Sequence, residues 1–357
     1  MTAKKDEVLI NNRLKEYQNV IIDYFIERAN FSGQSDTLAS IIGYLTIYGT
    51  LTQSQLQKLT KFSKSTISTG LSNLINVKYV KKEKIPGKRE YKYFLSYDSQ
   101  ESIDDALGSV KLEINFLRQK IRELREKFSE KHFGYTMLMK RLSDLTEIFE
   151  LYQVLIKKIK DPTKIVSDDY KLSSSDKLTQ DDFETILNDF DPKIKKFENE
   201  IIDFFRYESA YSTLKSFMLI VFVYFLTRKV LTQKKIRKLT NLSVGKISQV
   251  VNMLIRKGHI AEVDKRKYKS FIPKKLMRQK IYAMISVKES FFVAGINSLK
   301  QMVKWENKFK AIAEDLKERE QGLNQLYGYN IIEQTVSNNI ELMEIYKNAL
   351  KIFSRLL

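Results

Sequence analysis

The chain has 357 residues, 43% of them hydrophobic, and its 62 Lys and Arg against 43 Asp and Glu give a formal charge of +19. Its 12 Gly and 4 Pro are few for a strand-rich fold, and the lack of Cys excludes disulfides, thiol nucleophiles and cysteine-ligated metal sites. With only two histidines, His132 and His259, we expect neither a histidine metal site nor a His-based triad. The composition predicts a mostly α-helical, two-domain protein that is not an enzyme and needs no cofactor.

The N-terminal sequence and the apolar runs bear on location. The first residues, MTAKKDEVLINNR, are charged and hold no apolar core, so we expect no secretory signal. The longest apolar run, residues 217–226, is about half a membrane span. We therefore expect a cytoplasmic protein without a membrane partner.

The positive charge is concentrated in two short segments. Residues 35–97 carry ten basic and three acidic side chains, and residues 215–277 carry sixteen and two. Their excesses of +7 and +14 leave the rest of the chain slightly acidic. A merely solubilising surface would spread its lysines evenly, whereas clustering of this kind is the electrostatic footprint of a polyanion-binding protein. We expect a polyanionic partner, and the helix pairs and hairpins described below indicate double-stranded DNA and hence a nucleoid location.

An internal repeat with an offset of 180 residues runs through the chain. Between residues 51–80 and 231–260, eleven of thirty positions are identical without a gap. The repeat extends upstream, where Ile21–Phe25 recurs with one change as Ile201–Phe205. The chain is therefore interpreted as a tandem duplication.

The repeat also sets the expected domain boundaries. Its register slips by three residues after the matched block, so that 88–94 align with 265–271, which predicts a second hairpin three residues shorter than the first. We predict a first copy at 1–160 and a second at 183–357. The Ser- and Asp-rich segment 161–182 is the predicted linker.

Each copy is predicted to begin with an amphipathic helix. In the first copy, the apolar residues at 4-3-4-3 spacing are Ile10, Leu14, Tyr17, Ile21 and Tyr24. An apolar helix, at 38–48 or 214–227, and a short turn follow.

Two short helices separated by a tight turn come next in each copy. Thr52 is placed to cap the first helix, which buries Leu56 and Leu59, and Ser63 is placed to cap the second. The buried stripe of the second helix is Ile67, Leu71 and Leu74, matched in the other copy by Ile247, Val251 and Leu254 after Ser243. Alternating, lysine-rich residues then predict a two-stranded hairpin. A helix-turn-helix followed by a basic hairpin is a winged helix, expected at about 35–97 and about 215–277.

The outward side of the second helix and the hairpin supply the candidate DNA-binding residues. On the recognition helices these are Ser63, Lys64, Ser65, Thr66, Thr69 and Asn73, and Ser243, Gly245, Lys246 and Gln249, with Val244 and Met253 also facing outward. On the wings they are Lys82, Lys84, Lys88, Arg89 and Lys92, and Lys265, Arg266, Lys267 and Lys269. Short polar side chains near a helix N-terminus suit phosphate contact and base reading in the major groove. An ordinary solvated helical hairpin is the alternative, and the coincidence of helix pair, basic hairpin and charge in both copies favours DNA.

Long amphipathic helices follow each predicted wing. In the first copy, the apolar residues keep strict 4-3 spacing from Ile103 to Phe128, the pattern of a coiled-coil seam. Such a seam must be buried, either within the chain or in a homodimer through 103–128. The second copy has a looser seam. Trp305 and His259 are interpreted as packing residues.

Residues 51–94 resemble the winged-helix region of MarR-type regulators, in particular the GbsR branch. The turn and recognition helix match at Ser63, Lys64, Ile67 and Ser68, and the wing matches at Ile85, Pro86, Gly87, Arg89 and Lys92-Tyr93. In the second copy the turn matches through 242–248, whereas the wing lacks the Pro-Gly and keeps only Lys265-Arg266 and Tyr268. The resemblance implies dimers built from terminal helices, two winged helices on paired half-sites and, in some members, a small-molecule effector.

The leading hypothesis is a transcription regulator whose two copies form a pseudo-dimer within one chain and read paired, unequal half-sites. An architectural, chromosome-organising DNA-binding protein with little sequence preference is a second hypothesis, and a protein-interaction scaffold is a third. An enzyme is least expected, because no phosphate-binding Gly loop, metal-ligand cluster or nucleophile–base pair is present in the sequence.

Overall fold

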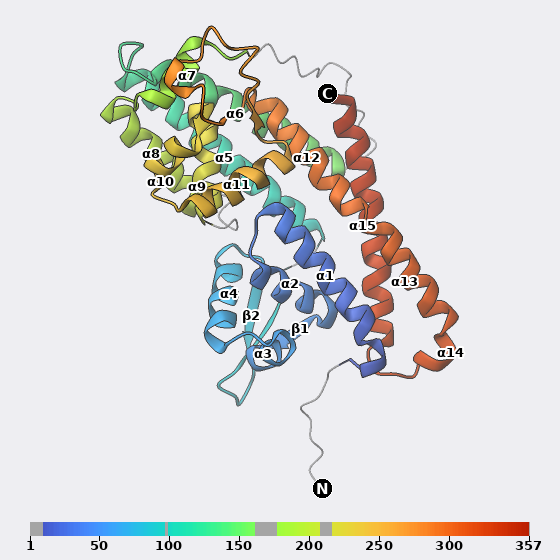
Figure 1. Ribbon diagram of the computed structural model, residues 1–357. Coiled ribbons are helices and arrows are strands. Elements are labelled where there is room, and N and C mark those ends of the chain that lie inside the picture. Colours follow the sequence, from blue (N-terminus) through green and yellow to red (C-terminus); the bar gives the residue numbers. More distant parts are fainter. Residues whose placement is uncertain (1–9, 97–98, 161–176, 208–215, 357) are drawn as a thin grey trace. The chain divides into compact units, whose positions relative to one another are not determined.

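The computed structural model describes residues 10–96, 99–160, 177–207 and 216–356 (Figure 1). The chain forms two compact units. Unit 1 comprises Met1–Asp98 and Leu299–Leu350, and unit 2 comprises Ser99–Ser298 and Lys351–Leu357. Both are mostly helical and each holds one small antiparallel sheet, in agreement with the predicted helical class with small β elements. Among the described residues, no helix has the length and apolarity needed to cross a membrane.

Unit 1 joins the first quarter of the chain to helices from its far end. Its N-terminal elements are η1 (Asn12–Leu14), α1 (Lys15–Ser32), α2 (Asp36–Tyr48), β1 (Thr50–Thr52), α3 (Gln53–Thr60), α4 (Lys64–Asn76), β2 (Val80–Lys84) and β3 (Tyr91–Leu95). Its C-terminal elements are α13 (Glu306–Glu318), α14 (Glu320–Leu323) and most of α15 (Tyr329–Leu356).

Unit 2 holds the middle of the chain. Its elements are α5 (Ser99–Lys127), α6 (Tyr135–Lys160), α7 (Gln180–Leu187), α8 (Pro192–Tyr207), α9 (Ser216–Arg228), β4 (Val230–Thr232), α10 (Gln233–Thr240), α11 (Val244–Lys257), β5 (Ala261–Glu262), η3 (Lys274–Leu276), β6 (Ile281–Ala283) and most of α12 (Val287–Val303).

The two units exchange helices relative to the two sequence copies. In unit 1, the ring of Tyr24 on α1 packs edge-on against Trp305 and Phe309, with ring centroids 5.6 and 5.2 Å away. The Tyr17 hydroxyl donates to the Asp315 carboxylate. The copy-one core is thus completed by copy-two helices, so the compact units do not follow the predicted division at 160 and 183. The prediction that Trp305 is a core residue is confirmed.

The long helices of copy one are in turn part of unit 2. The Phe116 ring on α5 stacks on the Phe204 ring of α8, with 3.6 Å between the ring centroids. The Lys120 ammonium donates to the Glu200 carboxylate at 2.7 Å. Leu117 and Leu124 of the α5 seam are fully buried in the core that α6, α8 and α9 also line, and Val110, Ile121 and Phe128 pack against that core partly buried. From Val110 onward the 103–128 seam is therefore covered within the chain, which was one of the two alternatives, and this part does not support a homodimer; the side chain of Ile103 lies outside the described residues.

Helix caps and core positions near each sheet follow the sequence expectation. The Thr52 hydroxyl accepts from the Gln55 amide, whose side chain accepts from the Thr52 amide, which closes a capping box on α3. Ser63 caps α4 and Ser243 caps α11. The predicted inward residues Ile67, Leu71, Leu74, Ile247, Val251 and Leu254 are all buried.

The two sheets share one topology. The strand orders are β1-β3-β2 and β4-β6-β5, antiparallel throughout. Lys81 pairs with Phe94 in the first, thirteen positions on, whereas Ala261 pairs with Ala283 in the second, twenty-two positions on. The predicted alignment of 88–94 with 265–271 is therefore wrong: the second loop is nine residues longer, not three shorter.

The extra length folds into a compact, lysine-rich segment that we call the basic lobe (residues 263–280). Its apolar residues Val263, Tyr268, Ile272 and Leu276 form a small core with strand residues and with α7. Since these side chains are buried, Tyr268, which the sequence matched to the first wing, is a packing residue.

The predicted linker is shorter than 161–182. Residues 161–176 lie outside the described part of the chain, but Leu178 and Asp182 are buried and α7 begins at Gln180. The Asp182 carboxylate accepts from the Thr179 amide at 2.8 Å and so fixes the start of the helix. This cap, with Phe183 and Ile186 beyond it, holds α7 against the basic lobe.

Candidate nucleic-acid interface

The two helix pairs, α3–α4 and α10–α11, have the same turn. In each, the first residue after the leading helix is left-handed, Lys61 with φ 59° and Asn241 with φ 56°. The capping serine follows two residues later, and its hydroxyl accepts from an amide in the first turn of the next helix, at 3.1 Å for Ser63 and 3.4 Å for Ser243. The left-handed residue ends one helix and the serine starts the next, which sets the angle between them.

On α4, the predicted reading residues divide into two groups. Ser65 and Thr66 lie within hydrogen-bond distance of the Ser63 hydroxyl, at 2.9 and 2.7 Å, so they belong to the cap. Lys64, Thr69 and Asn73 are exposed. The exposed face of α4 therefore presents an ammonium, a hydroxyl and an amide, each able to hydrogen-bond to base edges or phosphates.

The exposed face of α11 carries different chemistry. Gly245, Lys246 and Gln249 are exposed, and the Lys246 ammonium lies 5.6 Å from the centre of the Phe217 ring. Val244 is 56% exposed. The prediction that Met253 faces outward is wrong: it is buried, because it falls on the same stripe as Val250 and Leu254.

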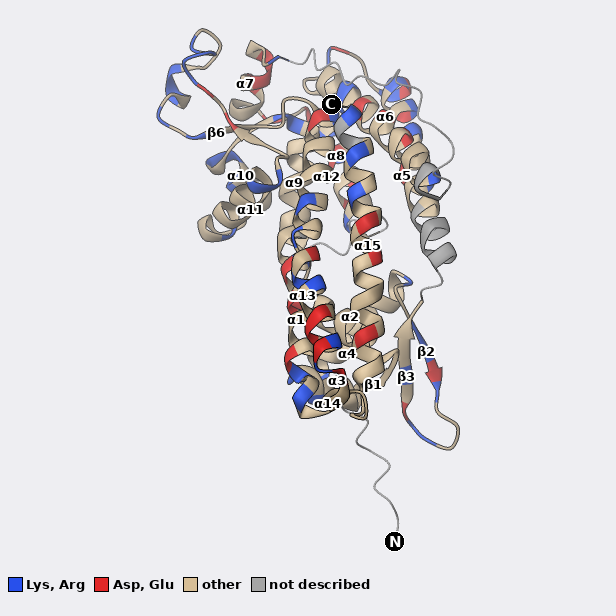
Figure 2. Cartoon of the chain, turned by 90° about the vertical axis from the view of Figure 1, so that its right-hand side faces the viewer, with Lys and Arg blue, Asp and Glu red and all other residues tan. Residues whose placement is uncertain are grey.

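The first hairpin, β2 to β3, is basic and exposed. From Lys81 onward every residue of β2 is exposed, and Gly87, with φ 75°, forms the tight turn at the tip. The predicted wing residues Lys82, Lys84, Lys88, Arg89 and Lys92 are all exposed, and Figure 2 shows this positive charge around the hairpin. The Lys82 ammonium lies 5.1 Å from the centre of the Tyr91 ring. A strand pair with so little core suits contact with another charged surface.

The basic lobe takes the place of the second hairpin. Of the predicted residues, Arg266, Lys267 and Lys269 are exposed, whereas the Lys265 ammonium donates to the Met277 carbonyl at 2.8 Å and so holds the lobe together. The structure adds four exposed cations that the sequence alignment did not select: Lys274, Lys275, Arg278 and Lys280. The sequence feature that could have identified them is the run of lysine and arginine between 274 and 280. The predicted alignment ended the second wing at 271 and so left this run out.

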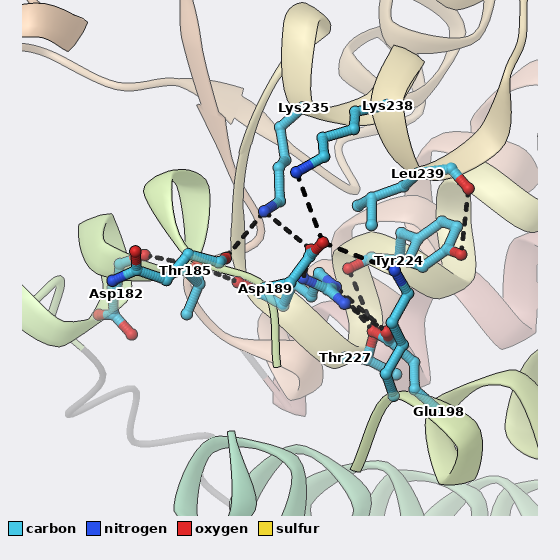
Figure 3. A network of polar contacts seen from close by, with 12 residues as sticks. Asp182, Thr185, Asp189, Glu198, Tyr224, Thr227, Lys235, Lys238 and Leu239 are labelled. Atoms are coloured by element: carbon cyan, nitrogen blue, oxygen red, sulfur yellow. Dashed lines mark hydrogen bonds and ion pairs between the residues drawn. The ribbon is translucent and has the colours of Figure 1, made fainter. Parts of the chain in front are cut away.

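A buried charge network reduces the surface charge of unit 2 (Figure 3). Arg228 and Glu198 are both fully buried, and the guanidinium donates to both carboxylate oxygens, with a shortest distance of 2.6 Å. Lys229 pairs with Asp182 at 2.9 Å and Lys235 with Asp189 at 3.0 Å. All three cations lie in the segment counted as +14, and all three carboxylates lie outside it. That count therefore overstates the positive charge of the surface.

Asp189 sits at the centre of the exposed end of this network. Its carboxylate lies within 4 Å of Lys195, Arg228, Lys235 and Lys238. Burial raises the pKa of Asp189, but the hydrogen bond and charge of Lys235, with Lys195 and Arg228, outweigh it and lower that pKa to about 2. This carboxylate stays ionised across the physiological range and ties α10 to the α7–α8 loop.

A cavity of about 650 Å³ lies between the start of α6, α7 and the end of α9. Two of its cations are already used: Lys229 pairs with Asp182, and the Arg141 guanidinium donates to the carbonyls of Phe225 and Leu226 at the end of α9. These contacts account for both side chains without a ligand, so the small-molecule effector stays a prediction.

Comparison with known proteins places the chain in no family. No protein-family model matches it, and no curated protein matches it. A solved structure described as the crystal structure of a transcriptional regulator is similar to 46% of this chain and 99% of its own, with 14% identity and a TM-score of 0.32. A likeness of that size assigns neither a fold nor a function to this chain.

Proposed function

We propose that the chain is a double-stranded DNA-binding protein, and a transcription regulator, that uses two unequal winged helix-turn-helix modules. The observation that carries the proposal is the recurrence, in one element order, of a capped helix with an exposed face beside an exposed basic segment. That face would enter the major groove, and the basic segment would lie along flanking phosphates. The residues that resemble MarR-type regulators of the GbsR branch, in 51–94, support the same role. We place the protein in the cytoplasm, on the nucleoid, and assign it no enzymatic activity.

An architectural role in organising DNA is the second candidate. Seven exposed cations on the basic lobe favour it, together with Val244 and Gly245, which place no hydrogen-bonding side chain at the first two positions of α11. Binding of that kind relies on the phosphate backbone and gives little sequence preference.

Two classes of substitution separate the candidates. Thr69→Ala or Gln249→Ala should lower the preference for a selected target over random duplex by about 1–3 kcal/mol if these side chains read bases. Arg89→Ala or Arg266→Ala should weaken binding to every duplex about equally, because phosphate contacts carry no sequence information. The full chain would be titrated against both duplexes at one salt concentration. If both classes lower the two affinities alike, the regulator proposal fails and the architectural one stands.

A further inference from the structure

The two recognition helices differ in the chemistry of their first residue. The repeat offset places Val244 of α11 where α4 has Lys64, and Gly245 where α4 has Ser65. Val244 is 56% exposed, the largest exposed fraction among the Val, Leu and Ile side chains of the described residues. In the described structure, nothing lies within 4 Å of the place that a Cβ on Gly245 would take. Beside the valine, the helix surface is therefore open to close approach.

The surroundings of Val244 indicate a polyanionic occupant rather than an apolar protein surface. The exposed residues of the preceding helix, α10, include Lys234, Arg237 and Lys238, and Figure 2 shows the resulting positive charge on α10. An exposed valine on a helix that packs against a cationic one fits a ligand that has an apolar group among anionic ones. In the major groove of DNA, the 5-methyl group of thymine is that apolar group, and the phosphates are the anions.

We propose that Val244 is a specificity-determining residue that contacts the 5-methyl group of a thymine in the half-site bound by the second module. The inference rests on the proposed DNA-binding function. Near the start of α11, Ser243 caps the helix and the Lys246 ammonium lies 5.6 Å from the centre of the Phe217 ring, so Val244 is the apolar side chain at this end of the exposed face. The second half-site is therefore recognised in part by apolar contact, and the first, through Lys64 and Thr69, by hydrogen bonds.

Deoxyuridine tests the contact, because it differs from thymidine only by the missing methyl group. Full-length protein would first be used to select a target from a random duplex pool. Each thymine of that target would then be replaced singly by deoxyuridine, and affinities compared for wild type, Val244→Ala and Val154→Ala. Val154, on α6, is a matched control because it is an exposed valine of the same unit that lies outside the proposed interface.

One replacement should weaken wild-type binding about fourfold, the factor expected for one apolar methyl group returned to water. Val244→Ala should lose a similar factor on the thymine target and become insensitive to deoxyuridine at that position, while Val154→Ala keeps the wild-type penalty. The inference is overturned if every replacement is neutral, if Val244→Ala retains the full penalty, or if the pool yields no preferred sequence. In those cases salt-dependent binding to duplex DNA would still stand, whereas failure of the proposed function itself would appear as no such binding to any duplex.

Discussion

One pair of matched residues joins two helices in both units, through a neutral hydrogen bond in unit 1 and through a buried ion pair in unit 2. In unit 1, the Tyr48 hydroxyl donates to the Gln18 side-chain oxygen at 2.8 Å. At the matching positions of unit 2, 180 residues later, the Arg228 guanidinium donates hydrogen bonds to both oxygens of the Glu198 carboxylate. The pairs join α1 to the end of α2 in unit 1 and α8 to the end of α9 in unit 2. The same helix–helix contact is therefore made by a neutral pair in one unit and by a charged pair in the other.

The comparison shows that positive charge has two uses in this chain. Around the first hairpin the cations are exposed, whereas in unit 2 Arg228, Lys229 and Lys235 are buried and matched by carboxylates of α7, α8 and the loop between them. A buried pair gains little over apolar packing, but the loss of one partner strands a charge. Unit 2 should therefore be the more sensitive to single charge removals.

The largest expected effect is that of Glu198→Ala. It leaves the Arg228 guanidinium buried without its main partner and should lower the free energy of unfolding of unit 2 by about 3–5 kcal/mol. The matched change in unit 1, Gln18→Ala, removes one neutral partner from the Tyr48 hydroxyl, which still accepts from the Ile10 amide, and should lower the free energy of unfolding of unit 1 by about 1 kcal/mol. Hydrogen exchange followed by mass spectrometry resolves the two units. Equal losses would contradict the comparison.

A double substitution sharpens the same prediction. Glu198→Leu with Arg228→Met removes both charges and keeps apolar bulk, so it should recover most of the stability that Glu198→Ala loses. If the double variant is as unstable as the single one, the ion pair itself, rather than the stranded charge, stabilises the joint.

The next effect is the pH dependence that His259 gives to unit 2. Its ring lies against Phe222, with a ring-centroid distance of 4.7 Å, and its Nδ1 lies 3.1 Å from the Ser290 hydroxyl. Burial, with the nearby charge of Lys257, holds the pKa of His259 well below its usual value. Below about pH 6.5 the imidazole of His259 is protonated in the unfolded chain but stays neutral in the folded one. The free energy of unfolding of unit 2 should therefore fall by about 1.4 kcal/mol per pH unit as the pH decreases toward the pKa of the folded state.

The histidine has a control within the repeat, because the matching residue of unit 1 is the exposed Tyr79. His259→Phe should remove the slope between pH 6.5 and 5 from unit 2, and unit 1 should show no such change on substitution of Tyr79→Phe. Urea denaturation at several pH values measures both. A slope that survives in His259→Phe would assign it to another group.

The smallest expected effect separates exposed from tethered cations of the basic lobe. Lys267→Ala should lower the slope of log affinity against log salt by about 0.9 if it removes one phosphate contact. Lys265→Ala should leave that slope unchanged and instead loosen the lobe, because its ammonium donates to the Met277 carbonyl. Equal slopes for the two variants would mean that the lobe does not face DNA.

The sequence predicted those features that local spacing determines. The caps Thr52, Ser63 and Ser243 and the buried stripes of α4 and α11 depend on residues within one or two turns, so a single sequence reveals them. The exchange of helices between the copies could not be predicted from the sequence. The apolar face of α5 shows that another segment must bury it, but it does not identify that segment. The basic lobe was missed because its core residues belong to no repeat. The network was missed because Asp182 and Asp189 lie in or near a stretch that resembles a linker.

The central claim, that the exposed cations of both halves hold duplex DNA, is tested most directly by the salt dependence of binding. The affinity of the full chain for one labelled duplex would be measured by fluorescence anisotropy over a range of monovalent salt. We expect log affinity to fall linearly with log salt, with a slope of about 0.9 for each phosphate contacted. A flat response, or no binding at low salt, would contradict the account.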